Sequence, residues 1–345
     1  MKSIIGIGLV ALDVVLEKNS EVKPILYAGG SCGNVLSILS YLGFSTYPIA
    51  RLANNRATEE LINDIKIWGV KTDLIFKGDD GSTPIIIQRI SKSKDGTPIH
   101  RFEFRDPETG KYLPSFKPVL VKSIEDLYNR KSFCDFFYLD RISRSSIELA
   151  KLYKNNGAII IFEPSSLKID NTSLLNEIVE FVDIIKFSND RIPHYKSIFE
   201  KGKIPIEIET LGKEGINYRI NTQLGDGEWK HVSTFDLVKI VDSAGAGDWT
   251  TAGIIKSLIE NNITTVNQID PNKFEDFLIY GQALGALSCL YKGARGLMYN
   301  VNKNELDYMS EELILNSFSK PFISKEICIE NSSKNFDSIS SLLLH

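Results

Sequence analysis

The chain has few of the residues that build metal or disulfide sites. Its 345 residues include only four histidines and four cysteines, and the cysteines (Cys32, Cys134, Cys289 and Cys328) are widely spaced without a Cys-x-x-Cys pair. A zinc site needs a cluster of such ligands, and a disulfide framework needs a denser set of cysteines. We therefore expect no zinc site, reduced cysteines and a cytoplasmic location.

The chain also lacks a strong net charge and a long apolar run. Its formal net charge is −4, whereas a nucleic-acid partner favours a strongly positive surface. No segment approaches the roughly 20 apolar residues that cross a membrane. Gly6, Gly8 and Asp13 interrupt the apolar N-terminal segment, which predicts a buried first strand rather than a signal peptide. We expect neither a nucleic-acid nor a membrane partner.

Short apolar runs alternate with helical patterns along most of the chain. We expect strands over 3–9, 46–52, 134–139, 158–164, 182–188, 204–212 and 215–220, and helices over 31–43, 58–69 and 143–157. Runs such as AIIIF (158–162) are apolar on both faces, which is typical of a parallel strand covered by helices on both sides. The pattern predicts an α/β fold, a three-layer α/β/α sandwich with a central, mostly parallel sheet.

Two regions interrupt this alternation. Residues 12–28 and 83–105 show strand-like patterns around a turn, and KDG (94–96) is typical of a hairpin tip. These regions predict a small separate sheet. They are either decorative hairpins or a lid that excludes water from a site. If the lid edge is exposed, two copies of the chain could pair through it as a homodimer.

The stretch VDSAGAGDWTTAGII (241–255) is the most informative part of the sequence. The preceding LVKIV (237–241) predicts a buried strand, and a helical pattern begins at Thr250. A turn of small residues before a helix directs backbone N–H groups and the helix dipole at one point, which favours an anion. Asp248 beside such a turn indicates either an N-cap or a base that accepts the proton of a hydroxyl attacking phosphorus.

Several motifs carry a family resemblance. DSAGAGD (242–248) resembles the DTxGAGD signature of the ribokinase-like (PfkB) carbohydrate kinases, and AGGSCGNVLSILSYLG (28–43) resembles their first signature. GIGLVALD (6–13), WGVKTDLI (68–75), ETLGKEG (209–215) and ALSCLYKGAR (286–295) resemble further family segments in the family's order. The resemblance covers about residues 3–300, and its weight comes from the combination of motifs.

The resemblance implies transfer of the γ-phosphoryl group of ATP, accompanied by Mg²⁺, to a primary alcohol of a sugar or nucleoside. Asp248 would be the general base. The anion hole would be the turn of Ala244, Gly245, Ala246 and Gly247. The substrate would contact Asp13, Gly29, Gly30 and Asn34. The nucleotide phosphates would contact Thr210, Gly212, Gly215 and Ala244. Residues 1–300 would form the kinase domain with its lid at 12–28 and 83–105, and 301–345 would form a C-terminal helix and tail of unknown role.

The chain departs from the family pattern in four places. ANNRA (53–57) replaces a GxDxxG segment, EPS (163–165) replaces DPN, and Trp249 follows the base. Ser188 and Arg191 stand at the Asn and Glu of an NxxE motif that organises Mg²⁺, which leaves Glu163 and Asn189 as candidate metal ligands. Arg141 follows an apolar strand and is either a clamp for an acidic group of the substrate or a surface residue.

Three alternatives to a sugar kinase remain open on the sequence. One is a nucleoside kinase of the same fold, which needs an apolar pocket for the base. Another is a regulatory homologue that binds nucleotide or sugar without turnover, as the altered NxxE segment allows. A dinucleotide-dependent oxidoreductase is the third, but GIGLVA (6–11) offers only the first two glycines of that fingerprint.

Overall fold

The computed structural model describes residues 2–17, 24–92, 98–165, 172–193, 202–237, 240–316 and 338–344. The strands are β1 (Ser3–Ile7), β2 (Ala11–Glu17), β3 (Ile25–Gly29), β4 (Ser45–Leu52), β5 (Ile75–Lys77), β6 (Ile85–Lys92), β7 (Pro98–Glu103), β8 (Phe136–Leu139), β9 (Ile159–Phe162), β10 (Ile184–Ser188), β11 (Ile206–Thr210), β12 (Ile216–Ile220) and β13 (Lys230–Val232). The helices are α1 (Ser31–Tyr41), α2 (Arg56–Ile67), α3 (Ile124–Arg130), α4 (Arg144–Asn155), α5 (Thr172–Val179), α7 (Ala246–Glu260), α8 (Pro271–Ser288), α9 (Gly296–Asn300) and α10 (Lys303–Asn316), with short 3₁₀ turns η1 (Val121–Ser123), η3 (Gly212–Glu214), η4 (Val266–Gln268) and η5 (Ser340–Leu343).

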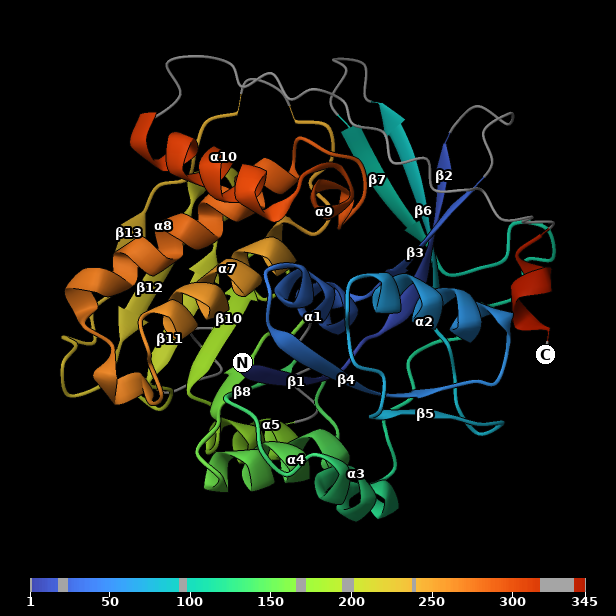
Figure 1. Cartoon of the computed structure of the whole chain (residues 1–345), viewed down its shortest axis with the longest axis horizontal. Coiled ribbons are helices and arrows are strands. Elements are labelled where there is room, and N and C mark those ends of the chain that lie inside the picture. Colours follow the sequence, from blue (N-terminus) through green and yellow to red (C-terminus); the bar gives the residue numbers. More distant parts are fainter. Residues whose placement is uncertain are drawn as a thin grey trace.

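A nine-stranded sheet forms the centre of the molecule. Its order is β13-β12-β11-β10-β9-β8-β1-β4-β5, and all its pairs from β5 to β11 are parallel, whereas β12 and β13 add antiparallel pairs at one edge. Helices α1, α7 and α8 cover one face and α3, α4 and α5 the other (Figure 1). The three-layer α/β/α prediction is therefore confirmed. The covered strands are buried along their length, as β8 and β9 illustrate.

A second sheet stands beside the first. It has the order β3-β2-β6-β7, with β2 antiparallel to β3, β6 antiparallel to β7, and β2 parallel to β6. It rises above one end of the large sheet, and α2 packs against β2 and β3 (Figure 1). The two regions that interrupt the strand–helix alternation thus pair into one sheet. The expected hairpin tip at 94–96 lies outside the described residues.

Close contact between α7 and α8 fixes the start of α7. A Cβ on Gly281 would lie 2.8 Å from the Thr250 carbonyl oxygen, and a Cβ on Gly253 would lie 2.7 Å from the Cα of Gly281. A Cβ on Gly285 would lie 2.9 Å from the carbonyl oxygen of Ala246, the first residue of α7. The two backbones touch at these glycines, so α7 cannot shift towards α8.

The segment before α7 differs from the prediction. The described part of 237–241 forms no strand, and Ile240 is 47% exposed. The N–H groups of Val241 and Asp242 donate to the Cys289 carbonyl at the end of α8 instead of to a strand. The prediction of a buried strand was wrong for the described residues Leu237, Ile240 and Val241, because the backbone at 241–242 bonds to a helix end and not to a neighbouring strand.

The start of α2 and the C-terminal part of the chain complete the comparison with the predicted elements. Helix α2 starts two residues earlier than expected because the Asn55 side chain accepts the Thr58 N–H and caps it. Helix α10 matches the expected C-terminal helix, and residues 317–337 lie outside the described part. The η5 turn packs against α2: Leu342 is buried, and the Leu344 carbonyl accepts the Arg56 N–H.

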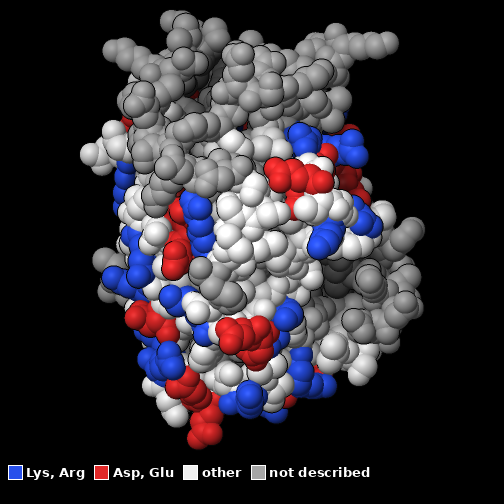
Figure 2. Space-filling view, turned by 90° about the vertical axis from the view of Figure 1, so that its right-hand side faces the viewer, with Lys and Arg blue, Asp and Glu red and all other residues white. Residues whose placement is uncertain are grey.

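Other expectations concern cysteines, surface charge and membrane spans. Cys32, Cys134 and Cys289 are free and buried, while Cys328 lies outside the described residues. Positive and negative side chains are interspersed among the described residues on the face seen in Figure 2, without a continuous field of one sign. No helix within the described ranges has both the length and the apolar character needed to cross a bilayer.

Candidate active site

The turn that leads into α7 is open to solvent on one side and tied down on the other. Gly245 is the N-cap, with a φ of 78°, and a Cβ there would lie 2.3 Å from the Ala294 carbonyl oxygen. Only glycine fits this left-handed and crowded position. Asp242 holds the turn by accepting the N–H of Ala244 at 2.7 Å and that of Gly293 at 2.8 Å.

The first turn of α7 has the features of an anion site. Gly247 is exposed, and the leading N–H groups of an α-helix have no partner inside the helix. The N-cap Gly245 has no side chain that could accept from them. The start of the helix dipole adds positive potential at the same place. The turn can therefore accept a phosphate group that approaches from solvent.

Asp248 lies in this first turn and is partly buried. Its Oδ2 accepts a hydrogen bond from Asn34 Nδ2 at 2.8 Å, so the first and last signatures meet here across 214 residues. Burial, followed by the Glu163 carboxylate, raises the pKa of Asp248 to about 8, against opposing effects of the Asn34 bond and of Lys186 and Arg191. A carboxylate with a pKa near neutrality is well suited to accept and release a proton.

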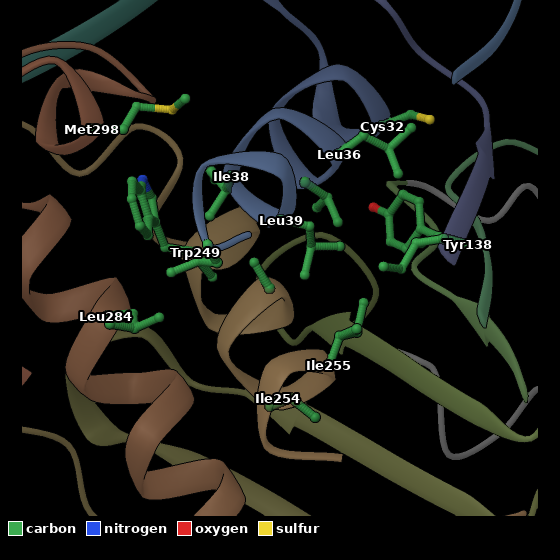
Figure 3. Packing of buried hydrophobic residues seen from close by; sticks show 14 of the residues in the cluster. Cys32, Leu36, Ile38, Leu39, Tyr138, Trp249, Ile254, Ile255, Leu284 and Met298 are labelled. Carbon is green, nitrogen blue, oxygen red and sulfur yellow. The ribbon is translucent and has the colours of Figure 1, made fainter. Parts of the chain in front are cut away.

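Trp249, the bulky residue after Asp248, does not enter the anion site. It is fully buried between α1, α8 and α9, and its Nε1 donates to the Ala294 carbonyl at 3.0 Å. Figure 3 shows its ring beside Met298, among the apolar side chains between α1 and α7. This departure from the family pattern is thus a packing feature of the core.

A group of polar side chains lies beneath the first turn of α7, directly after β9 and in the middle of β10. Lys186 forms an ion pair with Glu163, whose other carboxylate oxygen accepts from Thr251 Oγ1 at 2.6 Å and from the Tyr138 hydroxyl at 3.3 Å. The side chain of Lys186 is only 4% exposed. Glu163 already has a lysine as its counter-charge, which argues against it as a metal ligand.

The candidate substrate residues line the small sheet and the start of α1. Asp13 on β2 is buried and accepts from Gln88 Nε2 on β6 at 2.7 Å. A Cβ on Gly29 would lie 2.1 Å from the same Asp13 oxygen, and a Cβ on Gly30 would lie 2.4 Å from the Leu9 carbonyl oxygen. Gly29 therefore allows the chain to pass directly over Asp13, and Gly30 allows it to pass over the Leu9 carbonyl.

A buried arginine lies on the other side of Asp13. Arg295 forms an ion pair with Asp64 of α2, which also accepts the Ala28 N–H at 2.8 Å and the Tyr299 hydroxyl at 2.5 Å. Burial raises the pKa of Asp13 to about 7, although Arg295 opposes this shift. Asp64 thus joins α2 to the end of β3 and to the segment of Arg295 and Tyr299, which are far apart in sequence.

Asp13, Gln88 and Arg295 face a small cavity. Its volume is about 10 Å³, the room of one water or hydroxyl group. Asp13 Oδ1, Gln88 Oε1 and the Nε and Nη1 of Arg295 are buried without a hydrogen-bond partner among the described residues. Since buried polar groups are normally paired, these atoms indicate a place for a polar ligand.

Arg141 is engaged with its neighbour. Its Nη1 contacts the Asp140 carboxylate at 2.9 Å, and Asp140, which is buried, also accepts the Leu9 N–H at 2.9 Å. Burial raises the pKa of Asp140 to about 6, while Arg141 lowers it. Arg141 is therefore the counter-charge of the buried Asp140, which follows β8.

The candidate nucleotide residues lie at and just after the C-terminal end of β11, next to the C-terminal end of β10. Thr210 pairs in register with Ser188, and its carbonyl accepts the Asn189 N–H at 3.1 Å. Gly212 and Gly215 have positive φ values of 59° and 104° around the η3 turn. The structure brings Thr210 and Asn189 together. Among the described residues, no group of three acidic, histidine or cysteine side chains could hold a metal ion.

Several polar residues of this region give no signal in the sequence. They are Gln88, Asp140, Lys186, Thr251 and Arg295. Each has a partner that is distant in sequence, so the local pattern of strands and helices does not show its role. Lys186 is a partial exception: it stands alone inside the apolar run DIIKF (183–187), and a lysine is rarely buried without a partner.

Comparisons with known proteins identify the family and the fold. A sequence model of the pfkB family of carbohydrate kinases matches residues 1–299. A probable chloroplastic fructokinase-6 of Arabidopsis thaliana is 24% identical over 288 residues, which are 77% of this chain and 70% of the plant protein.

Solved structures share the fold at low sequence identity. Aminoimidazole riboside kinase of Salmonella enterica, in complex with aminoimidazole riboside and an ATP analogue, has a TM-score of 0.67 and 18% identity, covering 90% of this chain and 100% of that one. The nucleoside kinase of Burkholderia thailandensis in complex with inosine has a TM-score of 0.63 and 14% identity, covering 90% and 96%. The chain belongs to the pfkB family of carbohydrate kinases, which are phosphotransferases with an alcohol as acceptor.

Proposed function

We propose that this protein transfers the γ-phosphoryl group of ATP to a hydroxyl, in the first place a primary alcohol, of a sugar or sugar-like molecule. The observation that carries the proposal is the position of Asp248 in the first turn of α7, beside the exposed Gly247 and bonded to Asn34. A base and an anion site then share one helix turn. Phosphoryl transfer needs both within reach of the same atoms.

In the proposed reaction Asp248 accepts the proton of the acceptor hydroxyl. The acceptor oxygen forms a bond to the γ-phosphorus while the bond from that phosphorus to its bridging oxygen breaks, and ADP leaves. The N–H groups between Gly245 and Asp248 stabilise the charge on the transferring group. Asn34 holds the carboxylate of Asp248 in place by its 2.8 Å hydrogen bond.

The residues present fit the two ligands to different degrees. The exposed turn before α7, with Ala244 to Gly247, suits the phosphates of ATP, and Thr210, Gly212 and Gly215 are proposed to lie along them. For Mg²⁺, the described residues contain no group of three or more acidic, histidine or cysteine side chains that could hold the ion. Asn189 stays a candidate that would act through water, and Mg²⁺ would be held mainly by the nucleotide phosphates.

The acceptor is proposed to bind between the small sheet and the start of α1. Asp13, Gln88 and Arg295 would hold one hydroxyl in the cavity of about 10 Å³, since a hydroxyl both donates to a carboxylate and accepts from a guanidinium. Gly29, Gly30 and Asn34 would border the rest of the acceptor. In this proposal residues 1–300 form the kinase domain, and the small sheet is a lid that excludes water during transfer.

A nucleoside acceptor is a second candidate. Phe102 on β7 pairs in register with Gln88, so its ring lies on the same face of the small sheet as Asp13, and it is 48% exposed. An exposed ring beside the acceptor site could stack on a base. The likeness to kinases solved with a riboside and with inosine adds to this candidate.

The test is ADP release from Mg-ATP with a panel of sugars, sugar acids and nucleosides, with Asp248→Asn as the control. Turnover on one class that disappears in the variant supports the proposal and identifies the acceptor class. ATP binding without ADP release on any member would instead favour a regulatory protein that binds nucleotide without turnover.

A further inference from the structure

Lys186 is a buried cation that the reaction as proposed does not yet use. It interrupts the apolar strand β10, and its side chain is 4% exposed. Burying a charge costs free energy even when it is paired, and a hydrophobic pair at the same place is often as stable. The ion pair with Glu163 therefore does not by itself explain why a lysine stands at this position.

The location of the Lys186 ammonium group suggests what the lysine does at this position. Gly247 has no side chain, and a Cβ there would lie 3.7 Å from Lys186 Nζ and 3.9 Å from Glu163 Oε1. Gly247 is exposed and belongs to the first turn of α7. The lysine thus approaches the anion site from beneath, from the side of the sheet, while the opposite side is open to solvent.

The pair is held firmly in this place. Thr251, one turn further along α7, donates to Glu163 Oε2 at 2.6 Å, and the Tyr138 hydroxyl donates to the same oxygen at 3.3 Å. Glu163 in turn binds Lys186 through Oε1. An ammonium group has three donors, and Glu163 takes one of them, so others can serve a ligand.

The charges around the first turn of α7 make a buried cation useful there. Asp248 and Glu163 are both acidic, and an arriving triphosphate brings further negative charge. Lys186 and Arg191 are the cations that act on Asp248, and Arg191 is exposed whereas Lys186 is buried. Screening by water weakens an exposed charge far more than a buried one.

We infer that Lys186 is a catalytic residue that donates a hydrogen bond to an oxygen of the transferring γ-phosphoryl group. The inference rests on the proposed function. Lys186 keeps its proton throughout, because the proton of the acceptor goes to Asp248, and its charge offsets the charge that moves onto the leaving ADP. Glu163 and Thr251 are positioning residues that direct the ammonium group towards Gly247.

Nucleotide binding tests this inference without measuring turnover. Calorimetric titration of Mg-ATP and of Mg-ADP compares wild type with Lys186→Met. A hydrogen bond to a charged group contributes about 1.5–3 kcal/mol, so the affinity for ATP should fall roughly 10- to 100-fold. The affinity for ADP, which lacks the γ-phosphoryl group, should stay within about threefold. Lys186→Arg should restore part of the preference for ATP.

A matched control comes from the same helix. Lys256 on α7 is also a largely buried lysine, 9% exposed, and is paired with Glu260 at 3.0 Å. It lies ten residues from Ala246, the start of the helix, and Lys256→Met should leave both nucleotide affinities unchanged. If Lys186→Met fails to fold because Glu163 is left unpaired, the double variant Lys186→Met with Glu163→Gln removes both charges and can be titrated in its place.

The outcomes separate the two proposals. A wild-type protein that binds no ATP contradicts the proposed function itself. Wild-type binding of ATP with an unchanged ratio of ATP to ADP affinity in the Lys186 variants overturns only the role of Lys186. An equal loss of affinity for both nucleotides overturns it as well, because a structural defect at the site has no preference for the γ-phosphoryl group.

Discussion

The two ends of the candidate site differ in how well their polar groups are paired. Beneath α7, Lys186, Glu163 and Thr251 bind one another. At the small sheet, Asp13 Oδ1 and Arg295 Nη1 are buried without a partner among the described residues. We name the first the transfer end and the second the acceptor end, after the roles proposed for them. The side chains of the transfer end are paired before any ligand arrives, whereas those of the acceptor end are left for a ligand to complete.

The largest effect is expected from removing the proposed base, Asp248, at the transfer end. Asp248→Asn keeps the size and the contact with Asn34, but it cannot accept a proton. We expect kcat to fall by roughly 10²- to 10⁴-fold, while the affinities for ATP and the acceptor change little. Steady-state kinetics with separate binding titrations check this. A kcat within about tenfold of wild type would show that Asp248 is not the base.

The same variant has a stability signature. The pKa of Asp248 is about 8 in the folded protein and 3.8 without burial, so the folded state holds a proton that the unfolded state releases between these values. The stability contributed by this group is fully present below pH 3.8 and is lost as the pH rises through 8. The melting temperature of Asp248→Asn relative to wild type should therefore increase with pH.

The pH dependence of the wild-type rate gives the next largest effect. With both substrates below saturation, the rate should fall about tenfold for each pH unit below 8, because only ionised Asp248 can act as a base. Burial and then Glu163 raise this pKa, and the Asn34 hydrogen bond, Lys186 and Arg191 lower it. A rate that stays flat between pH 6 and 8 would contradict a raised pKa of Asp248 in the free enzyme.

A change at the acceptor end should act on acceptor binding alone. Asp13→Asn weakens the bond to the acceptor hydroxyl, so the KM for the acceptor should rise roughly 10- to 100-fold with little change in the affinity for ATP. Kinetics with varied acceptor and a titration of ATP measure the two effects. Equal losses for acceptor and ATP would mean that the two ends are not independent.

The smallest expected effect concerns the support of α7. Gly281→Ala places a methyl group 2.8 Å from the Thr250 carbonyl oxygen, and such overpacking should lower the free energy of unfolding by about 1–3 kcal/mol. Gly33→Ala in α1 is the matched control, since its methyl group would lie 3.6 Å from the nearest atom. Urea denaturation compares the two. An equally stable Gly281→Ala would indicate that α7 can move.

The sequence predicts the fold better than the site. Alternation of apolar strands with helices is sufficient for the parallel sheet, because each buried strand carries its own signal. The family signatures point to Asn34 as a substrate contact and to Asp248 as the base, but the hydrogen bond between them emerges only from the fold. The roles of Lys186 and Arg295 could not be predicted this way, since each depends on partners that folding brings together. The lysine inside its apolar run indicates that a buried partner exists, but it does not identify that partner.

The separate pairing of the small sheet has a consequence for how the acceptor specificity of such an enzyme can change. The four strands of this sheet pair with one another, and within the described ranges none of them pairs with a strand of the large sheet. Mutations in β2, β6 or β7 can therefore alter the shape and polarity offered to the acceptor while the backbone contacts that hold α7 stay intact. An engineer could screen libraries confined to these strands for new acceptors and keep the phosphoryl donor chemistry constant.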